Sequence, residues 1–365
     1  MIFLLALALP LLAAAPATNA SAWTMFRADA RLSGRAQGEL PADPKPLWTF
    51  RAQKGISSTA AIANGMAYVG ALDGNLYALD LATGKLRWKY VAGAEIKSSP
   101  SVAGGVVYFG DSKGVFHAVD AKTGAKRWTF KAEGEIISSA NFTPDCVLFG
   151  SYDQFLYCIK EGKTVWKVET DGYVHAMPAV DGDRIISAGC DGWLRVLRAS
   201  DGKELRRVQL GGYTGASPAV ADGRAYVGTF ENQFLAVDLA SGAVAWTYEH
   251  PVRKFPYYAS AALGDGFVAV GGRDKLVRAL DMKTGRELWA WSARAAVDAS
   301  PVLLGDRVFA ADKSGRIFAL DARTGKPVWT FDAGAGIDAS PAIAEGRLVI
   351  STSEGTVYAF GAKKG

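Results

Sequence analysis

One segment recurs along this chain at a spacing of about 40 residues, and that period restricts the possible folds more than any other feature. The segment has the form Ala-x-Asp-x-x-Thr-Gly-x-x-x-Trp, and its first full copy runs from Ala78 to Trp88. The tryptophan position is occupied in turn by Trp48, Trp88, Trp128, Trp166, Arg206, Trp246, Trp289 and Trp329, at separations of 38 to 43 residues.

A second landmark keeps the same period, which makes the repeat independent of any single motif. It is a short Ser/Ala-Ser-Pro-like triplet, and its copies begin at Ser58, Ser98, Ser138, Ala176, Ala216, Ala259, Ala299 and Ala339. Two landmarks with eight copies each predict eight structural units.

Each unit contains four short runs of Val, Ile, Tyr, Phe and Trp that are separated by Gly and Asp, which is typical of β-strands. In the second unit the strands are expected at Pro100–Ala103, Val106–Gly110, Val115–Val119 and Lys126–Phe130. No amphipathic helix is evident in the sequence. The pattern predicts an all-β, eight-bladed β-propeller with four-stranded blades over residues 47–361.

The two ends of the repeat region complement each other. The last unit, Ser340 to Phe360, supplies three strands, whereas Leu47–Arg51 is one strand with no partners before it. Pairing the two ends completes the eighth blade and removes two unpaired strand edges. We therefore expect the N-terminal strand to close the last blade.

The first residues of the chain predict export. Residues 1–22 have the pattern of a signal peptide: Ile2 to Ala15 is almost wholly apolar, and small residues follow as far as Ala22. Cleavage is expected after Ala20 or Ala22. No cysteine stands there to accept a lipid, so we expect a periplasmic or secreted protein that is not lipidated. No later run of 18 apolar residues exists, so no transmembrane helix is expected. Residues 23–46 form an N-terminal leader segment and 362–365 a tail.

The repeat Ala-x-Asp-x-x-Thr-Gly-x-x-x-Trp resembles the tryptophan-docking motif of the PQQ-like repeat family of β-propellers, and Trp23-x-x-Phe26-Arg27-x-Asp29 resembles the leader before many such propellers. The resemblance implies that the tryptophan of one blade packs against the turn of the next. The residues expected to dock in this way are Trp48, Trp88, Trp128, Trp166, Trp246, Trp289 and Trp329. We expect Trp88, Trp128, Trp246, Trp289 and Trp329 to be largely buried.

The family includes quinone-dependent alcohol and glucose dehydrogenases, the outer-membrane assembly factor BamB and binding proteins, so it implies no single function. A dehydrogenase of this family is expected to carry a Glu/Asn/Asp set around Ca²⁺, a planar pyrroloquinoline quinone (PQQ) site and usually two adjacent cysteines. This chain has no adjacent cysteines, and its units lack long insertions. We expect no catalytic residues and no cofactor. The alternative is a small PQQ- and Ca²⁺-dependent alcohol or sugar oxidoreductase.

The residue three positions before each proline position of the second landmark is expected to face the central channel. Around the ring these residues are Ser57, Lys97, Ile137, His175, Gly215, Tyr258, Asp298 and Asp338. Five of them are ionisable, so the axis is a candidate site for a small ligand. The alternative is that a wet channel simply tolerates polar side chains.

The longest separation between tryptophan positions contains Glu249–Tyr258, a loop rich in cations and aromatics. Such residues are favoured at protein interfaces. The candidate ligand- or partner-binding residues are Lys97, His175, Arg253, Lys254, Phe255, Tyr257, Tyr258, Asp298 and Asp338. Ordinary variation in loop length remains an alternative.

A monomeric propeller that binds an envelope protein or a small ligand is therefore the expected function. The formal net charge of +5 is dispersed, so nucleic acid is not an expected partner. The three histidines, His117, His175 and His250, fall at different positions within their units, so no metal site is expected.

Cys146 and Cys158 lie in one predicted hairpin. If Phe149 opposes Phe155 there, the two cysteines are directly opposed and within reach of a disulfide. The alternative is that Cys158 only replaces the small Ala78 and Ala118 of other units. With three cysteines in the chain, at least one thiol stays free or pairs between chains.

Overall fold

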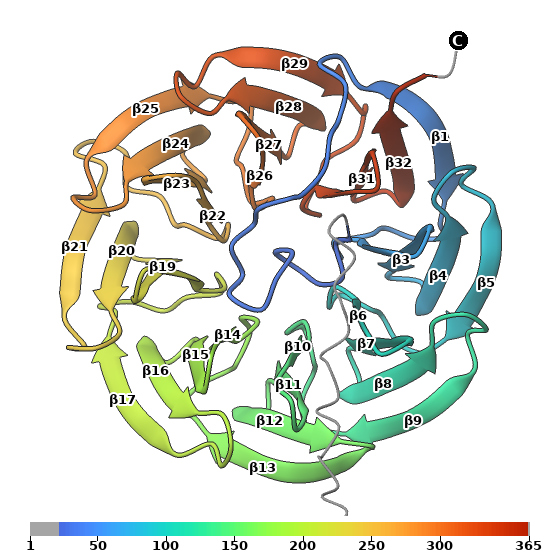
Figure 1. The fold of residues 1–365 in the computed structure, drawn as a ribbon, viewed down its shortest axis with the longest axis horizontal. Helices are drawn as coiled ribbons and strands as arrows, with labels where there is room; N and C mark the ends of the chain where they lie inside the picture. Colours follow the sequence, from blue (N-terminus) through green and yellow to red (C-terminus); the bar gives the residue numbers. More distant parts are fainter. Residues whose placement is uncertain (1–21, 364–365) are drawn as a thin grey trace, which may run out of the picture.

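The computed structural model describes residues 22–363, and within them it contains 32 strands and no helix. The strands form eight antiparallel sheets of four strands each, arranged in a ring around a central axis (Figure 1). The sequence-based prediction of an eight-bladed propeller is confirmed. The predicted signal peptide lies outside the described residues, apart from Ala22.

Blades 1 to 4 follow one another along the chain, each running from the axis outwards. Blade 1 contains β2 (Ala61–Ala63), β3 (Met66–Gly70), β4 (Asn75–Asp80) and β5 (Leu86–Val91). Blade 2 contains β6 (Ser101–Ala103), β7 (Val106–Gly110), β8 (Val115–Asp120) and β9 (Lys126–Lys131). Blade 3 contains β10 (Asn141–Phe142), β11 (Val147–Gly150), β12 (Phe155–Lys160) and β13 (Lys163–Glu169). Blade 4 contains β14 (Ala179–Asp181), β15 (Arg184–Ala188), β16 (Trp193–Arg198) and β17 (Glu204–Gln209).

Blades 5 to 8 complete the ring. Blade 5 contains β18 (Ala219–Ala221), β19 (Arg224–Gly228), β20 (Gln233–Asp238) and β21 (Val244–Glu249). Blade 6 contains β22 (Ala262–Leu263), β23 (Phe267–Gly271), β24 (Leu276–Asp281) and β25 (Glu287–Ser292). Blade 7 contains β26 (Val302–Leu304), β27 (Arg307–Ala311), β28 (Arg316–Asp321) and β29 (Pro327–Asp332). Blade 8 contains β30 (Ala342–Ala344), β31 (Arg347–Ser351), β32 (Thr356–Gly361) and β1 (Lys45–Arg51).

The N-terminal strand closes the ring, as the sequence predicted. β1 runs antiparallel to β32, with Lys45 opposite Gly361 and Arg51 opposite Thr356. The first and last strands of the repeat region therefore share one sheet, and closure leaves neither of them with two free edges.

Antiparallel order places the inter-strand connections on two opposite faces of the ring. The connections from the outermost strand of one blade to the innermost strand of the next share a face with the loops between second and third strands. We call this the channel face. The first hairpin of each blade and its Asp-x-x-Thr-Gly turn lie on the other face, which we call the leader face.

Docking between blades follows from the turn at the end of each third strand. The carboxylate of Asp80 accepts bonds from the N–H and hydroxyl of Thr83 at 2.9 and 2.7 Å, and Gly84 adopts a φ of +71°. A Cβ atom at Gly84 would lie 2.6 Å from the ring of Trp48, so only glycine lets the indole approach this closely.

The docked indoles also donate hydrogen bonds to the blade that they contact. The pairs are Trp48 with the carbonyl of Leu81, Trp88 with Ala121, Trp166 with Ala199, Trp246 with Met282 and Trp289 with Ala322, at 2.9 to 3.2 Å. Trp246, Trp289 and Trp329 are buried. Trp88 and Trp128 are half-buried, so the expectation that they are largely buried was too strong, because both lie on the outermost strand of a blade, where most residues are exposed.

The leader crosses the centre of the ring, a path that the sequence did not reveal (Figure 1). Its carbonyls accept the edge N–H groups of six innermost strands. These bonds run from Ile62 to Trp23, Val102 to Thr24, Val180 to Ala30, Val220 to Arg31, Leu263 to Ser33 and Leu303 to Gly34, at 2.6 to 2.9 Å. The leader therefore satisfies strand edges that face the axis and have no other sheet partner.

Three side chains of the leader, Trp23, Arg27 and Leu32, are wholly buried. Arg27 donates to the carbonyl of Ala261 at 2.7 Å, but its other two nitrogens have no protein partner within the described residues. Burial lowers the pKa of Arg27 to about 9, opposed by the charge of Asp29.

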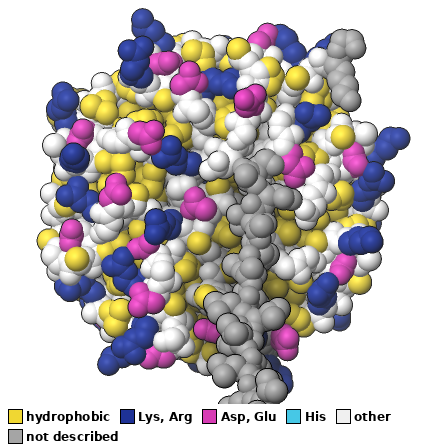
Figure 2. All heavy atoms as spheres, viewed as in Figure 1, with side chains coloured by type: hydrophobic (Ala, Val, Ile, Leu, Met, Phe, Trp, Pro, Cys, Tyr) yellow, Lys and Arg dark blue, Asp and Glu magenta, His cyan; other side chains and the backbone are white. Residues whose placement is uncertain are grey.

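On the face drawn in Figure 2, positive and negative side chains are interspersed around the ring.

Cys146 and Cys158 form a disulfide in the structure, with Cα atoms 5.5 Å apart, and Cys190 is a free thiol. The register that we expected for their hairpin is wrong. Phe149 lies opposite Tyr157 rather than Phe155, and Cys158 lies opposite Leu148. The register is that of the other blades, where Val69 lies opposite Tyr77, and Gln154 adopts the positive φ, 73°, of the glycines at 74 and 114.

Among residues 22–363, no helix is long and apolar enough to cross a membrane.

Candidate functional site

The innermost residues of all eight blades meet at the axis, on the channel face. They line a cavity of about 360 Å³ together with Phe26 of the leader. The cavity includes every member of the predicted ring: Ser57, Lys97, Ile137, His175, Gly215, Tyr258, Asp298 and Asp338. The repeat period was therefore sufficient to find which residues share the axis.

Beneath this ring lies a circle of hydroxyl groups that connects neighbouring blades. In seven of the eight copies of the second landmark, the backbone N–H of the middle residue donates to the hydroxyl at the same position of the next blade, at 2.9 to 3.1 Å. The acceptors are Ser99, Ser139, Ser217, Ser260, Ser300, Ser340 and Thr59. Met177 interrupts the circle, because its side chain offers no hydroxyl to the preceding blade. The recurring serine of the second landmark is thus explained by blade-to-blade bonding.

Ion pairs occupy the side of the cavity formed by blades 6 to 8. Arg273 donates to both carboxylate oxygens of Asp298, at 3.0 and 2.9 Å, and lies 3.5 Å above the ring of Tyr258. Lys313 bridges Asp298 and Asp338, at 3.4 and 2.5 Å. Burial alone would lower the pKa of Lys313, but the bonds and charges of Asp338 and Asp298 raise it.

The opposite side of the cavity holds the imidazole of His175. Burial lowers the pKa of His175, opposed by the charge of Glu135. His175 Nδ1 lies 2.8 Å from the hydroxyl of Tyr152, whose pKa burial raises to about 12. Glu135 itself lies 2.9 Å from Lys97. The ring residues Lys97 and His175 therefore contact side chains that lie outside the predicted ring.

This donor set does not fit a Ca²⁺-bound quinone. Ca²⁺ takes six to eight oxygen ligands in proteins, and the two axial carboxylates, Asp298 and Asp338, are already paired with Arg273 and Lys313. Within the described part of the chain, no three His, Cys, Asp or Glu side chains gather as a metal site would require.

The Glu249–Tyr258 loop reaches the mouth of the cavity. Arg253 donates to the carbonyl of Asp274 at 3.0 Å, and the N–H of Arg273 donates to the carbonyl of Pro256 at 3.4 Å. Phe255 is 49% exposed, and Arg253 and Lys254 also lie at the surface.

Tyr257 was expected to contact a partner, and this prediction is wrong. The side chain is only 2% exposed and packs against Phe234 with the rings nearly perpendicular. A Cβ at Gly228 would lie 2.4 Å from that of Tyr257, so the tyrosine fills space that glycine leaves in the neighbouring strand. Its role is packing between blades.

Exposed apolar side chains gather on the channel face around this loop. The large hydrophobics with high exposure in residues 22–363 lie either on outermost strands or in three successive inter-blade connections. The second group consists of Tyr173, Tyr213, Val252, Phe255 and Tyr258, which we call the docking patch. Tyr258 also stacks on Phe230 at 4.3 Å.

Sequence reasoning missed Tyr173 and Tyr213, although the repeat held a signal for them. They stand two residues before the ring members His175 and Gly215. In the other units this position is Gly55, Glu95, Glu135, Pro256, Ala296 and Gly336, so an aromatic residue here is a departure from the pattern.

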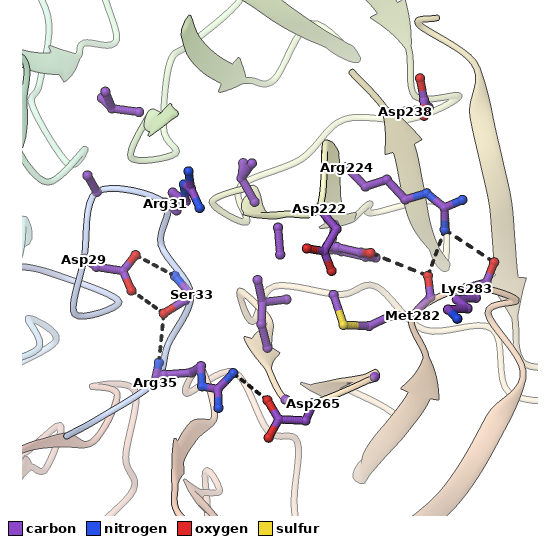
Figure 3. Close-up of a pocket in the computed structure, with 18 residues that line it drawn as sticks. Asp29, Arg31, Ser33, Arg35, Asp222, Arg224, Asp238, Asp265, Met282 and Lys283 are labelled. Carbon is purple, nitrogen blue, oxygen red and sulfur yellow. Dashed lines mark hydrogen bonds and ion pairs between the residues drawn. The ribbon is translucent and has the colours of Figure 1, made fainter. Parts of the chain in front are cut away.

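A second cavity, of about 1030 Å³, lies on the leader face between blades 5 and 6 (Figure 3). Arg35 pairs with Asp265 at 2.9 Å, and Arg224 donates to the carbonyl of Met282 at 3.1 Å. The lining alternates between cations and carboxylates, so it favours no single ligand charge.

Comparisons with known proteins agree with this architecture. The family model described as "Outer membrane protein assembly factor BamB" matches residues 35–150, 153–289 and 273–365. A protein of that name from Shewanella oneidensis is 27% identical over 148 residues, 37% of this chain and 38% of the relative's length.

Solved structures show the same fold at low identity. BamB from Moraxella catarrhalis superposes with a TM-score of 0.77 at 18% identity, covering 87% of this chain and all of that one. The quinohemoprotein alcohol dehydrogenase from Comamonas testosteroni gives 0.81 at 14% identity, covering 95% and 82%. The fold is therefore shared by an assembly factor and by an enzyme. The chain belongs to the PQQ-like repeat family of β-propellers, the family described as the outer membrane protein assembly factor BamB.

Proposed function

We propose that this protein is a non-catalytic scaffold of the cell envelope that binds a partner protein through the docking patch and contributes to outer membrane protein assembly. The observation that carries the proposal is the position of Tyr173, Tyr213, Val252, Phe255 and Tyr258 on three successive connections of one face. Exposed apolar side chains that are clustered in this way mark interaction sites.

The chemistry of the patch suits a protein partner. Tyr and Phe provide large contact areas at a low cost in side-chain entropy, and aromatic residues and Arg are enriched in interfaces. Tyr258 is held by its stack on Phe230 and by Arg273 above its ring. A side chain already fixed in this way loses little further freedom when a partner binds.

The axial cavity supports a structural role better than a catalytic one. Its volume of about 360 Å³ is near the lower limit for ligand pockets, and its charged groups neutralise one another. Catalysis would need charged groups directed at a bound substrate in a closed site.

Location in the envelope rests on the predicted signal peptide and on the relatives, which are named as outer membrane assembly factors. The match spans 38% and 35% of the length of two such relatives. We therefore propose the same compartment and the same kind of work for this chain.

Deletion of the gene, followed by complementation, tests the proposal. The wild-type gene and the Tyr213→Ala/Phe255→Ala double variant are compared by the amount of heat-modifiable, folded barrel protein in the outer membrane. We expect the double variant to fail to complement although it accumulates normally. The matched control is Val165→Ala/Leu205→Ala, which removes equally exposed apolar side chains from outermost strands and should complement.

Two results would refute the proposal. One is full complementation by the double variant of the patch. The other is reduction of a dye by the purified protein with added PQQ, Ca²⁺ and an alcohol or sugar, since that would establish the oxidoreductase alternative.

A further inference from the structure

The docking patch has carboxylates around its middle connection and cations at the end that leads into blade 6. In the middle connection, between blades 4 and 5, Tyr213 lines a crevice of about 300 Å³ with Asp191, Gln209, Gly211, Gly212 and Glu231. All the charged side chains that line this crevice are carboxylates. Tyr213 is 58% exposed beside them.

Glu231 is the carboxylate of this crevice that remains available. Its side chain lies across Gly212, where an added Cβ would come within 2.4 Å of Glu231 Cγ. It forms no ion pair with any side chain of residues 22–363. Asp191 instead pairs with Arg195, which lies buried beneath it and also contacts the largely exposed Asp171 at 3.2 Å. Glu204 lies 3.4 Å from the same guanidinium, so three carboxylates surround it.

The end formed by blade 6 has the opposite character. Arg253 stands two residues before the exposed Phe255, and its guanidinium contacts a backbone carbonyl rather than a carboxylate. Lys275 lies at the surface next to Asp274, the residue whose carbonyl Arg253 contacts. Lys254 pairs with Glu249. Arg253 and Lys275 are the cations of this end without a carboxylate partner in the described chain.

We infer that the patch binds an extended segment of a partner protein in which a Lys or Arg side chain enters the Tyr213 crevice, apolar side chains cover Tyr258 and Phe255, and an Asp or Glu meets Arg253. The inference rests on the proposed function and adds the chemistry and orientation of the partner. An exposed tyrosine face beside carboxylates favours an incoming cation, both by charge and by its π-electrons.

Polyanionic partners fit this surface poorly. A nucleic acid or an anionic lipid surface would meet Arg253 but would bring like charge against Glu231, Asp191 and Asp171. A peptide can carry both signs in one short segment, so it can complement both charged regions at once.

The test uses the full mature protein and a random 12-residue peptide library displayed on phage. Clones are selected on the wild type and counted again on the Tyr213→Ala/Phe255→Ala variant, so that binding to the patch is separated from binding elsewhere. We expect the patch-dependent clones to carry a basic and an acidic residue separated by apolar residues, in one order along the peptide.

The best of these sequences is then synthesised, and its affinity is measured by fluorescence anisotropy. Glu231→Lys should weaken binding by about tenfold, and replacing the basic residue of the peptide by Glu should restore it. The matched control is Glu354→Lys, because Glu354 is exposed at the same loop position in blade 8. That control should leave the affinity unchanged.

The outcomes distinguish this inference from the proposed function. Patch-dependent peptides without the charge order, or peptides indifferent to Glu231→Lys, would overturn the inference and leave a docking patch in place. A library that yields only clones independent of the patch would overturn the inference and also count against the proposed function.

Discussion

At the residue scale, the repeat is maintained in most blades by a tryptophan, an aspartate and a glycine. The tryptophan covers the glycine of the next turn, and the aspartate closes that turn, so each residue stabilises the contact between two blades. Where the tryptophan is replaced by Arg206, the side chain still covers Gly242 and donates to the carbonyl of Ser241 at 2.6 Å. A flat side chain that carries an N–H donor is thus what the position requires.

Replacement of a docked tryptophan should be costly. Trp289 is buried and bonds the carbonyl of Ala322 at 2.9 Å, so Trp289→Ala should lower the free energy of unfolding by about 3–5 kcal/mol. The measurement is the midpoint of urea unfolding. Val328→Ala, at an exposed position of β29, is the control and should change stability by less than about 1 kcal/mol. Equal effects of the two variants would contradict the docking role.

The turn aspartates should make the protein sensitive to acid. Bonds from the Thr83 hydroxyl and from Arg87 lower the pKa of Asp80 to about 2 in the folded state, below its ordinary value. The stability that this contributes is fully present above about pH 4 and is lost as the pH falls towards 2, because the unfolded chain binds the proton first. Asp80→Asn should therefore be less stable than the wild type at pH 6, with the difference vanishing near pH 2.

Melting temperatures of both proteins across this pH range provide the check. A difference that stays constant down to pH 2 would show that the Asp80 charge contributes nothing to the turn.

At the scale of elements, β1 and the leader hold the ring together from its edge and from its centre. β1 supplies the fourth strand of blade 8, and the leader satisfies the inner edges of six blades. Deleting residues 1–52 should therefore cost far more stability than deleting Lys363–Gly365, which follow the last strand. Thermal melts of the two truncated proteins decide the matter. Similar melting temperatures would mean that the ring tolerates an open blade.

The hairpin of β11 and β12 carries the only disulfide found in the described residues. Replacing both Cys146 and Cys158 by Ser should lower the stability of the oxidised protein by about 2–4 kcal/mol, because the crosslink restricts the unfolded chain. Thiol titration of the unfolded protein should find one free group, Cys190, before reduction and three afterwards. Three free groups from the start would show that the bond does not form.

The error in the register of this hairpin shows how far local sequence reasoning reached. Opposing Phe149 to Phe155 treated the hairpin alone, whereas Val69 pairs with Tyr77 in blade 1 and the repeat carries that pairing to Phe149 and Tyr157. The period of the repeat therefore predicts the correct register. The turn was hard to recognise because Gln154 adopts the positive φ, whereas most other blades have glycine or asparagine at that position.

At the scale of the whole molecule, the repeat predicted the number of blades, the closure by β1 and the residues around the axis. It could not predict the path of the leader, because that segment is unique and bonds the ring mostly through its backbone, which leaves no side-chain pattern. It also could not show that Tyr257 is buried while Phe255 is exposed, since that depends on the space beside Gly228.

The docking patch lies where three neighbouring units depart from the pattern on one face. Near-identical blades serve mainly to hold the ring, so binding is expected where the repeat is broken. Tyr173, Tyr213 and the Glu249–Tyr258 loop are such breaks, and the packing of successive blades places them on one face.

Site-specific photo-crosslinking in living cells tests this central claim most directly. A benzophenone amino acid is placed in separate variants at Tyr213, at Phe255, at Val165 on an outermost strand and at Arg224 in the cavity of the leader face. The account predicts that irradiation joins the first two positions to the same envelope protein and leaves the last two free of it. Adducts from Val165 or Arg224 without any from Tyr213 and Phe255 would contradict the account.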